Sequence, residues 1–103
     1  MLLQQGDVLL KSVKKIPAGT KKVKRQERGW VLAEGEVTGH AHVIDEDIDL
    51  ILDEAGTMFM SNDAPVTIKH EEHKHITVPA GNWEIGIVKE YDHFAEESRR
   101  VQD

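Results

Sequence analysis

The chain has no cysteine, which excludes disulfide bonds and the thiolate ligands of many structural zinc sites. Aromatic residues make up only 5% of the 103 residues, and no apolar run approaches the roughly 20 residues that a membrane-spanning helix needs. The opening MLLQQGDVLL also lacks the basic start and the small-residue cleavage site of a signal peptide. We therefore expect a cytoplasmic protein without membrane contact, in which histidine, carboxylate, backbone or water would hold any metal ion.

Basic residues are fewer than acidic residues, and the two kinds are unevenly distributed along the chain. The chain has 13 Lys and Arg against 19 Asp and Glu, a net charge of −6. Residues 1–30 carry eight basic residues and two acids, whereas residues 31–54 carry eight acids and no base. The negative balance argues against nucleic-acid binding, and KKVKR (21–25) has no interleaved aromatic side chain for base stacking. We expect two solvated faces, with an anionic partner on KKVKR as the alternative.

Short strands are the recurring structural signal. In DIDLILD (47–53), Ile48, Leu50 and Leu52 alternate with their neighbours, and WEIGIVKEY (83–91) alternates in the same way. A period of two indicates half-buried strands, and Gly, Pro, Asn or Asp residues separate the segments. The sequence therefore predicts one all-β domain over residues 1–103, a small barrel or sandwich of about eight short strands. The tail, residues 92–103, is predicted to be a short helix that begins at Asp92.

Five of the six histidines fall in two segments, GHAH and HEEHKH. If residues 40–44 form a strand, His40 and His42 point to the same face, about 6–7 Å apart at Cα, and both can reach one ion. The sixth histidine, His93, is expected at the start of the tail helix and is excluded from the site. The spacing predicts a divalent metal site, and the alternative is a structural or pH-responsive contact.

The segment HEEHKH (70–75) allows three local structures. A two-residue turn at Glu71–Glu72 would oppose His70 to His73, and a four-residue loop would oppose His70 to His75. A single strand with a bulge is the third option. The spacing differs from the helical H-E-x-x-H motif of metalloproteases, and the β-branched flanks exclude a helix, so the two glutamates are interpreted as solvated turn residues.

The predicted metal ligands are His40, His42, His70, His73 and His75. The ion would be Zn, Fe, Ni or Mn, and Glu36 or Glu46 would orient the ligating rings. Three protein ligands would leave a position for an activated water, but no motif indicates a substrate or a reaction. A domain of this size has little room for a deep pocket unless it forms a homo-oligomer. The alternative function is a non-catalytic module that binds a protein partner through Trp30, Met58, Met60 and Trp83, although core packing is the expected use of most of these.

Two resemblances rest on these residues. His40, His42 and Glu46, with Gly35 and Gly56 nearby, resemble the first motif of cupins, which are metal-holding β-barrels; Pro79 and Gly81 resemble the second motif, with Glu84 in place of its histidine. The segments QGDVLL, LAEGEVTGHAH, HEEH, VPAGNWEI and KEYD resemble a small uncharacterised family of bacterial and phage proteins over nearly the whole chain. The second resemblance implies a bacterial or phage origin and carries no activity with it.

Overall fold

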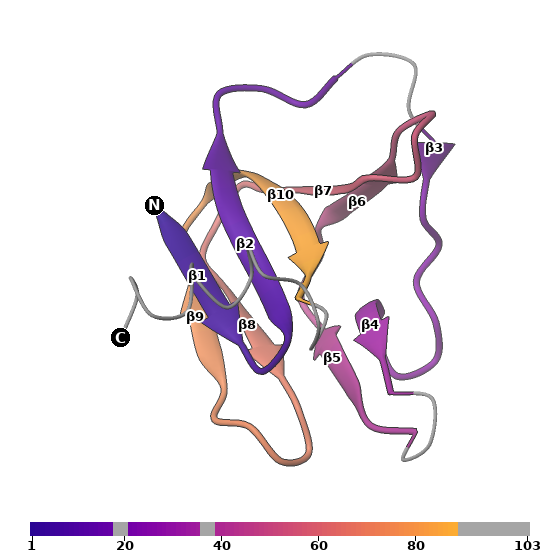
Figure 1. The fold of residues 1–103 in the computed structure, drawn as a ribbon, viewed down its shortest axis with the longest axis vertical. Helices are drawn as coiled ribbons and strands as arrows, with labels where there is room; N and C mark the ends of the chain where they lie inside the picture. Colours follow the sequence, from indigo (N-terminus) through magenta and orange to yellow (C-terminus); the bar gives the residue numbers. More distant parts are fainter. Residues whose placement is uncertain (18–20, 36–38, 89–103) are drawn as a thin grey trace.

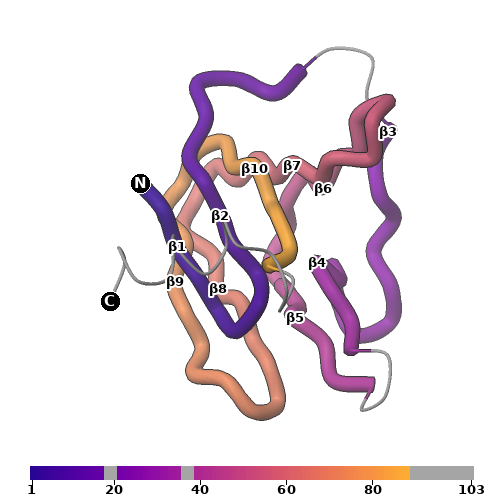
Figure 2. Tube along the Cα trace, in the orientation of Figure 1, coloured from indigo at the N-terminus to yellow at the C-terminus, as the bar shows by residue number. Residues whose placement is uncertain are grey.

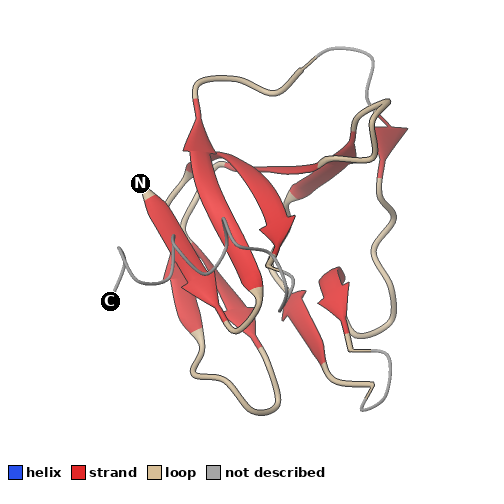
Figure 3. Ribbon diagram, in the orientation of Figure 1, coloured by secondary structure: helices blue, strands red, loops and turns tan. Residues whose placement is uncertain are grey.

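The computed structural model describes residues 1–17, 21–35 and 39–88. Every regular element within these ranges is a β-strand (Figure 3), and the ten strands form two antiparallel sheets. The predicted all-β class is therefore confirmed. The predicted helix over residues 92–103 lies outside the described residues.

One sheet has six strands and the other has four. The six-stranded sheet has the spatial order β1 (Leu2–Gln5), β2 (Val8–Val13), β10 (Gly81–Ile87), β7 (Met58–Asn62), β6 (Asp49–Leu52) and β3 (Lys21–Lys22). The four-stranded sheet has the order β4 (Trp30–Glu34), β5 (Ala41–Ile44), β8 (Val66–Lys69) and β9 (Ile76–Val78).

A single hydrophobic core joins the two sheets. Leu10, Met60 and Trp83 contribute to it from the six-stranded sheet, and Ile44 and Ile68 contribute from the four-stranded sheet. The predicted alternation brings these side chains to the inner faces, because successive residues of a strand point to opposite sides. Met60 and Trp83 are buried, and Trp30 and Met58 pack against the same core. These four residues therefore do not form an exposed apolar face for a partner.

The first strand was not predicted from the sequence. β1 pairs with β2 in a hairpin in which Gln5 opposes Val8, so Gly6 and Asp7 are the two turn residues. Gly6 has φ +57° and the described non-glycine residues have no positive φ, which matches the type II′ pattern of a two-residue hairpin turn. The Gly–Asp pair between two apolar segments was the local signal for this hairpin.

Three segments, two turns or loops and the start of one strand, meet at one end of the molecule. The β1–β2 turn, the start of β5 and the loop between β8 and β9 all lie at the lower end of the view in Figure 1, and the tube in Figure 2 shows the same convergence. These segments contain Asp7, His42 and HEEHKH. The fold therefore brings together groups that are far apart in the sequence.

Candidate functional site

Four histidine rings lie against one another at this end of the fold. The ring centroids of His42 and His70 are 4.4 Å apart, those of His70 and His73 are 4.6 Å apart, and those of His42 and His73 are 5.9 Å apart. His40 joins the group through His70, at 5.8 Å in an edge-on arrangement. Two segments separated by some thirty residues of chain thus form one imidazole cluster.

The cluster lines a small polar cavity of about 200 Å³. Asp7, Glu34 and Glu72 add carboxylates to the four imidazoles around it. His40 and His42 both face this cavity, whereas Ala41 and Val43 line a separate pocket. This alternation is the one expected of a β-segment, although β5 itself begins at Ala41 and His40 immediately precedes it.

HEEHKH adopts none of the three predicted local structures. In the β8–β9 hairpin, Ile68 pairs with Ile76 and Val66 with Val78, so all six residues from His70 to His75 form the loop. In this register, His70 is paired across the two strands with neither His73 nor His75. His70 and His73 still approach each other, because the loop folds back so that His70 Nδ1 accepts hydrogen bonds from the backbone amides of Glu72 and His73.

His42 is held between Gln5 and Asp7. Its Nδ1 lies 2.8 Å from Gln5 Oε1, and its Nε2 lies 3.2 Å from Asp7 Oδ1. The Gln5 amide nitrogen donates to the carbonyl oxygens of Ile68 and Lys74, which fixes the orientation of this amide. Gln5 Oε1 must therefore accept, and His42 Nδ1 must carry the proton. In neutral His42, the Nε2 lone pair then faces the Asp7 carboxylate.

Protonation of His42 would relieve this contact, but the surroundings oppose it. The His42 side chain is only 5% exposed, and burial lowers its pKa below the usual value of 6.5. Positive charge on His70 and His73 lowers the pKa further, while Asp7 raises it by attraction and by its hydrogen bond. The net shift is downward, so His42 is mainly neutral at neutral pH. His42 Nε2 and Asp7 Oδ1 are then two hydrogen-bond acceptors that lie 3.2 Å apart.

The two glutamates of the loop are anchored rather than merely solvated. Glu71 Oε2 accepts a hydrogen bond from the Ala41 amide at 3.0 Å, and Glu72 Oε1 lies 3.2 Å from His40 Nδ1. Backbone amides, first that of Glu71 itself and then that of Ala41, lower the pKa of the Glu71 carboxyl. Both residues are exposed in the loop, as expected of solvated turn residues, and their side chains also tie the loop to the start of β5.

The other predicted site residues lie elsewhere. His75 lines the separate pocket with Ala41 and Val43 and does not line the histidine-lined cavity. Glu46, which the cupin resemblance paired with the histidines, accepts a hydrogen bond from the Thr67 amide at 2.9 Å instead. Glu36 lies outside the described residues.

Sequence reasoning missed the two residues that flank His42. Asp7 is 35 residues and Gln5 is 37 residues from His42 along the chain, and no local pattern marks either of them. As the side chains stand, no group of three or more His, Asp or Glu residues in the described ranges is arranged to hold a metal ion. The described part of the chain also has no helix with the length and apolar character that a membrane crossing requires.

Comparison with known proteins gives a family and no activity. No curated protein and no solved structure matches the chain. A family model described as a domain of unknown function, DUF8820, matches residues 4–87, which include the β1–β2 turn, β5 and the histidine-rich loop. The chain therefore belongs to the DUF8820 domain family.

Proposed function

We propose that the histidine-lined cavity binds one divalent transition-metal ion, with His42 Nε2 and Asp7 Oδ1 as its first two ligands. The observation that carries this proposal is the separation of 3.2 Å between these two atoms. Two ligands of a tetrahedral ion with bonds of about 2.0–2.2 Å lie about 3.3–3.6 Å apart. The pair is therefore already close to the spacing of two neighbouring ligands.

The charge balance also favours a bound cation. A lone pair and a carboxylate repel each other at this distance unless a proton or a metal ion lies between them. The lowered pKa of His42 disfavours the proton. The hydrogen bond from His42 Nδ1 to Gln5 supports the metal, because ligating histidines almost always donate their second ring nitrogen to an acceptor.

The remaining ligands would come from the neighbouring rings. His40 Nδ1 lies against Glu72, so the same pattern of an outer carboxylate and an inner Nε2 applies to it. His70 is the weaker candidate, because its Nδ1 accepts backbone hydrogen bonds and its Nε2 therefore carries the proton in the neutral ring. Rotation of the His40 or His73 ring would supply a third ligand. The resulting set differs from the cupin arrangement, because Asp7 supplies the carboxylate in place of Glu46.

Nitrogen and oxygen ligands without thiolates suit Zn, Fe, Ni or Mn, and they suit Ca or Mg less well because those ions prefer oxygen. Three protein ligands would leave one position for water, whose pKa the ion would lower. The proposal ends at metal binding and names no reaction. Cytoplasmic localisation and a bacterial or phage origin stay predictions, as does a homo-oligomer.

The test is the metal content of protein purified without a metal-affinity tag, measured by plasma emission. We expect about one ion per chain in the wild type and its loss in His42→Gln and Asp7→Asn, since one tetrahedral site needs both ligands. Asp7→Asn preserves the shape of a half-exposed turn side chain, so it tests the site even if His42→Gln fails to fold.

His75→Gln is the matched control, because it removes a histidine of the same loop that lines the other pocket. It is expected to keep the ion. Absence of metal from the wild type, with a melting temperature unchanged by added Zn, Ni, Mn or Fe, would leave the structural or pH-responsive role of the histidines and overturn the proposal.

A further inference from the structure

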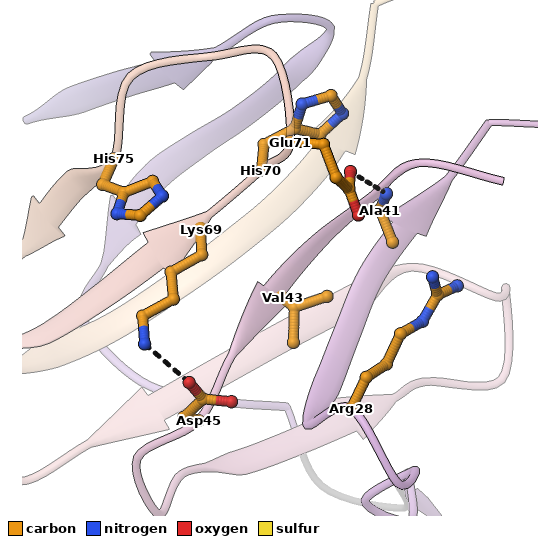
Figure 4. Close-up of a pocket in the computed structure, with 8 residues that line it drawn as sticks. All are labelled: Arg28, Ala41, Val43, Asp45, Lys69, His70, Glu71 and His75. Atoms are coloured by element: carbon orange, nitrogen blue, oxygen red, sulfur yellow. Dashed lines mark hydrogen bonds and ion pairs between the residues drawn. The ribbon is translucent and has the colours of Figure 1, made fainter. Parts of the chain in front are cut away.

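A second pocket lies on the opposite face of β5 from the histidine-lined cavity. Figure 4 shows its apolar side, formed by Ala41 and Val43, with Arg28 and Lys69 on either side. The pocket has a volume of about 320 Å³. Ala41 and Val43 are 1% and 8% exposed, yet they stand outside the main hydrophobic cluster. The pocket therefore combines a small apolar surface with charged walls.

A carboxylate of the chain itself is bound in this pocket. The ladder between β5 and β8 consists of two pairs, Val43 with Lys69 and Ile44 with Ile68. Continued in the same register, it would place Glu71 opposite Ala41. The Glu71 side chain instead supplies the acceptor, and its Oε2 lies 3.0 Å from the Ala41 amide nitrogen (Figure 4). The backbone N–H at the end of the ladder is thus a carboxylate-binding group.

The lining of the pocket carries two cations and two carboxylates, and Glu71 is held by the Ala41 amide. Arg28 and Lys69 supply two positive charges, and Asp45 and Glu71 supply two negative charges. Asp45 holds Lys69 at 2.7 Å, and Arg28 is held by Glu34 at 3.1 Å, on the cavity side of the sheet. If the Glu71 carboxylate leaves, the pocket lining loses one negative charge, which a bound monoanion would restore.

We propose that this pocket binds a small monocarboxylate with a short apolar body, whose carboxylate takes the place of the Glu71 side chain on the Ala41 amide. The apolar part of the ligand would cover Ala41 and Val43, and the carboxylate would lie between Arg28 and Lys69. Glu71 acts as an internal competitor that occupies the position when the ligand is absent. The pocket shares His70 with the histidine-lined cavity, so the proposal is tested on metal-free protein.

The test is a titration of the full chain, kept metal-free by a chelator, with sodium butyrate, followed by the amide signal of Ala41 in ¹H–¹⁵N spectra. Butyramide, the neutral analogue of the same shape, is titrated in parallel at the same ionic strength. In Glu71→Ala, we expect butyrate to bind ~10-fold or more tightly than in the wild type, since a hydrogen bond to a charged group contributes at least about that factor. Butyramide is expected to bind weakly to both proteins.

Glu46→Ala is the matched control. Its carboxylate accepts a hydrogen bond from the Thr67 amide of β8 and does not line the pocket, and because it acts electrostatically on Lys69 its removal also controls for the loss of one nearby negative charge. It is expected to bind butyrate as the wild type does. Glu71→Gln, which keeps the side-chain shape without the charge, is expected to give an intermediate affinity. The proposal is overturned if Glu71→Ala gains no affinity for butyrate, or if butyramide binds that variant as tightly as butyrate.

Discussion

At the scale of single residues, the geometry of the candidate site depends on one buried amide. Gln5 is 3% exposed and makes three hydrogen bonds, two as a donor to carbonyl oxygens and one as an acceptor from His42. The two donated bonds prevent the amide from turning over. Gln5 therefore determines which nitrogen of His42 has the lone pair, and it also holds the loop through the Lys74 carbonyl.

Gln5→Met is expected to lower the free energy of unfolding by ~1–3 kcal/mol, because it leaves buried polar groups without partners. It is also expected to weaken zinc binding ~10–100-fold, the usual cost of losing the outer partner of a ligating histidine. Urea denaturation and zinc titration measure the two effects. Gln4→Met is the control, because the Gln4 amide donates to the Gly6 carbonyl and does not contact His42. Equal effects of the two substitutions would contradict the role given to Gln5.

His42 is also expected to make the stability of the metal-free protein depend on pH. Its folded-state pKa is lowered below 6.5, with burial as the main cause. The unfolded chain therefore binds this proton first as the pH falls, and the free energy of unfolding decreases from about pH 6.5 down to the folded-state pKa. His42→Gln should show a weaker decrease in the same window. Urea midpoints measured between pH 5 and 8 with a chelator check this, and identical pH profiles of the two proteins would refute it.

At the scale of elements, two features of the β1–β2 turn favour glycine at position 6: the backbone conformation and the contact with His73. Gly6 has φ +57°, and a Cβ placed on it would lie 2.5 Å from His73 Nε2. The His73 ring thus packs directly on the turn, so a side chain at position 6 would displace it.

Gly6→Ala is expected to cost more than the ~1–2 kcal/mol that a left-handed conformation alone costs a non-glycine residue. Gly56→Ala provides the comparison, because Gly56 has φ +86° and nothing lies within 4 Å of its added Cβ. The difference between the two variants in denaturant unfolding measures the contact with His73. Equal losses of stability would mean that the ring moves aside at no cost.

Most strands could be predicted from the sequence, whereas the conformation of the β8–β9 loop could not. Alternation in segments such as WEIGIVKEY (83–91) predicted the strands, because burial of one face requires a period of two. In β10 the alternation of burial holds for Trp83 and Ile85, whereas Ile87, which was expected on the same face, is 48% exposed. The register of the β8–β9 loop could not be predicted, since HEEHKH contains no residue that prefers positive φ and no other local feature that selects one turn. β1 could have been predicted, because the Gly6–Asp7 pair is a local signal of a two-residue hairpin turn.

At the scale of the whole molecule, the candidate site joins the two sheets. Asp7 is in the turn of the six-stranded sheet, and His42 is in the four-stranded sheet. Of the five histidines predicted to share one site, His40, His42, His70 and His73 gather at this junction, and His75 lies elsewhere. Asp7 could not be assigned from sequence, because its contact with His42 exists only once both sheets have packed on the common core.

A metal ion that links the sheets should stabilise the folded chain by mass action. Free zinc at about 100 times its dissociation constant is expected to add ~2.7 kcal/mol to the free energy of unfolding. Thermal or urea unfolding with zinc and with a chelator checks this. Asp7→Asn should respond much less than the wild type, and an equal response would place the bound ion outside this site.

The most direct measurement follows the ring nitrogens of the histidines in long-range ¹H–¹⁵N spectra at pH 7.5, first with a chelator and then with one equivalent of zinc. We predict that His42 carries its proton on Nδ1 in both states and that zinc shifts the Nε2 signal of His42 to a metal-bound position. A proton on His42 Nε2 in the metal-free protein, or zinc-induced shifts at His75 with the His42 signals unchanged, would contradict this prediction.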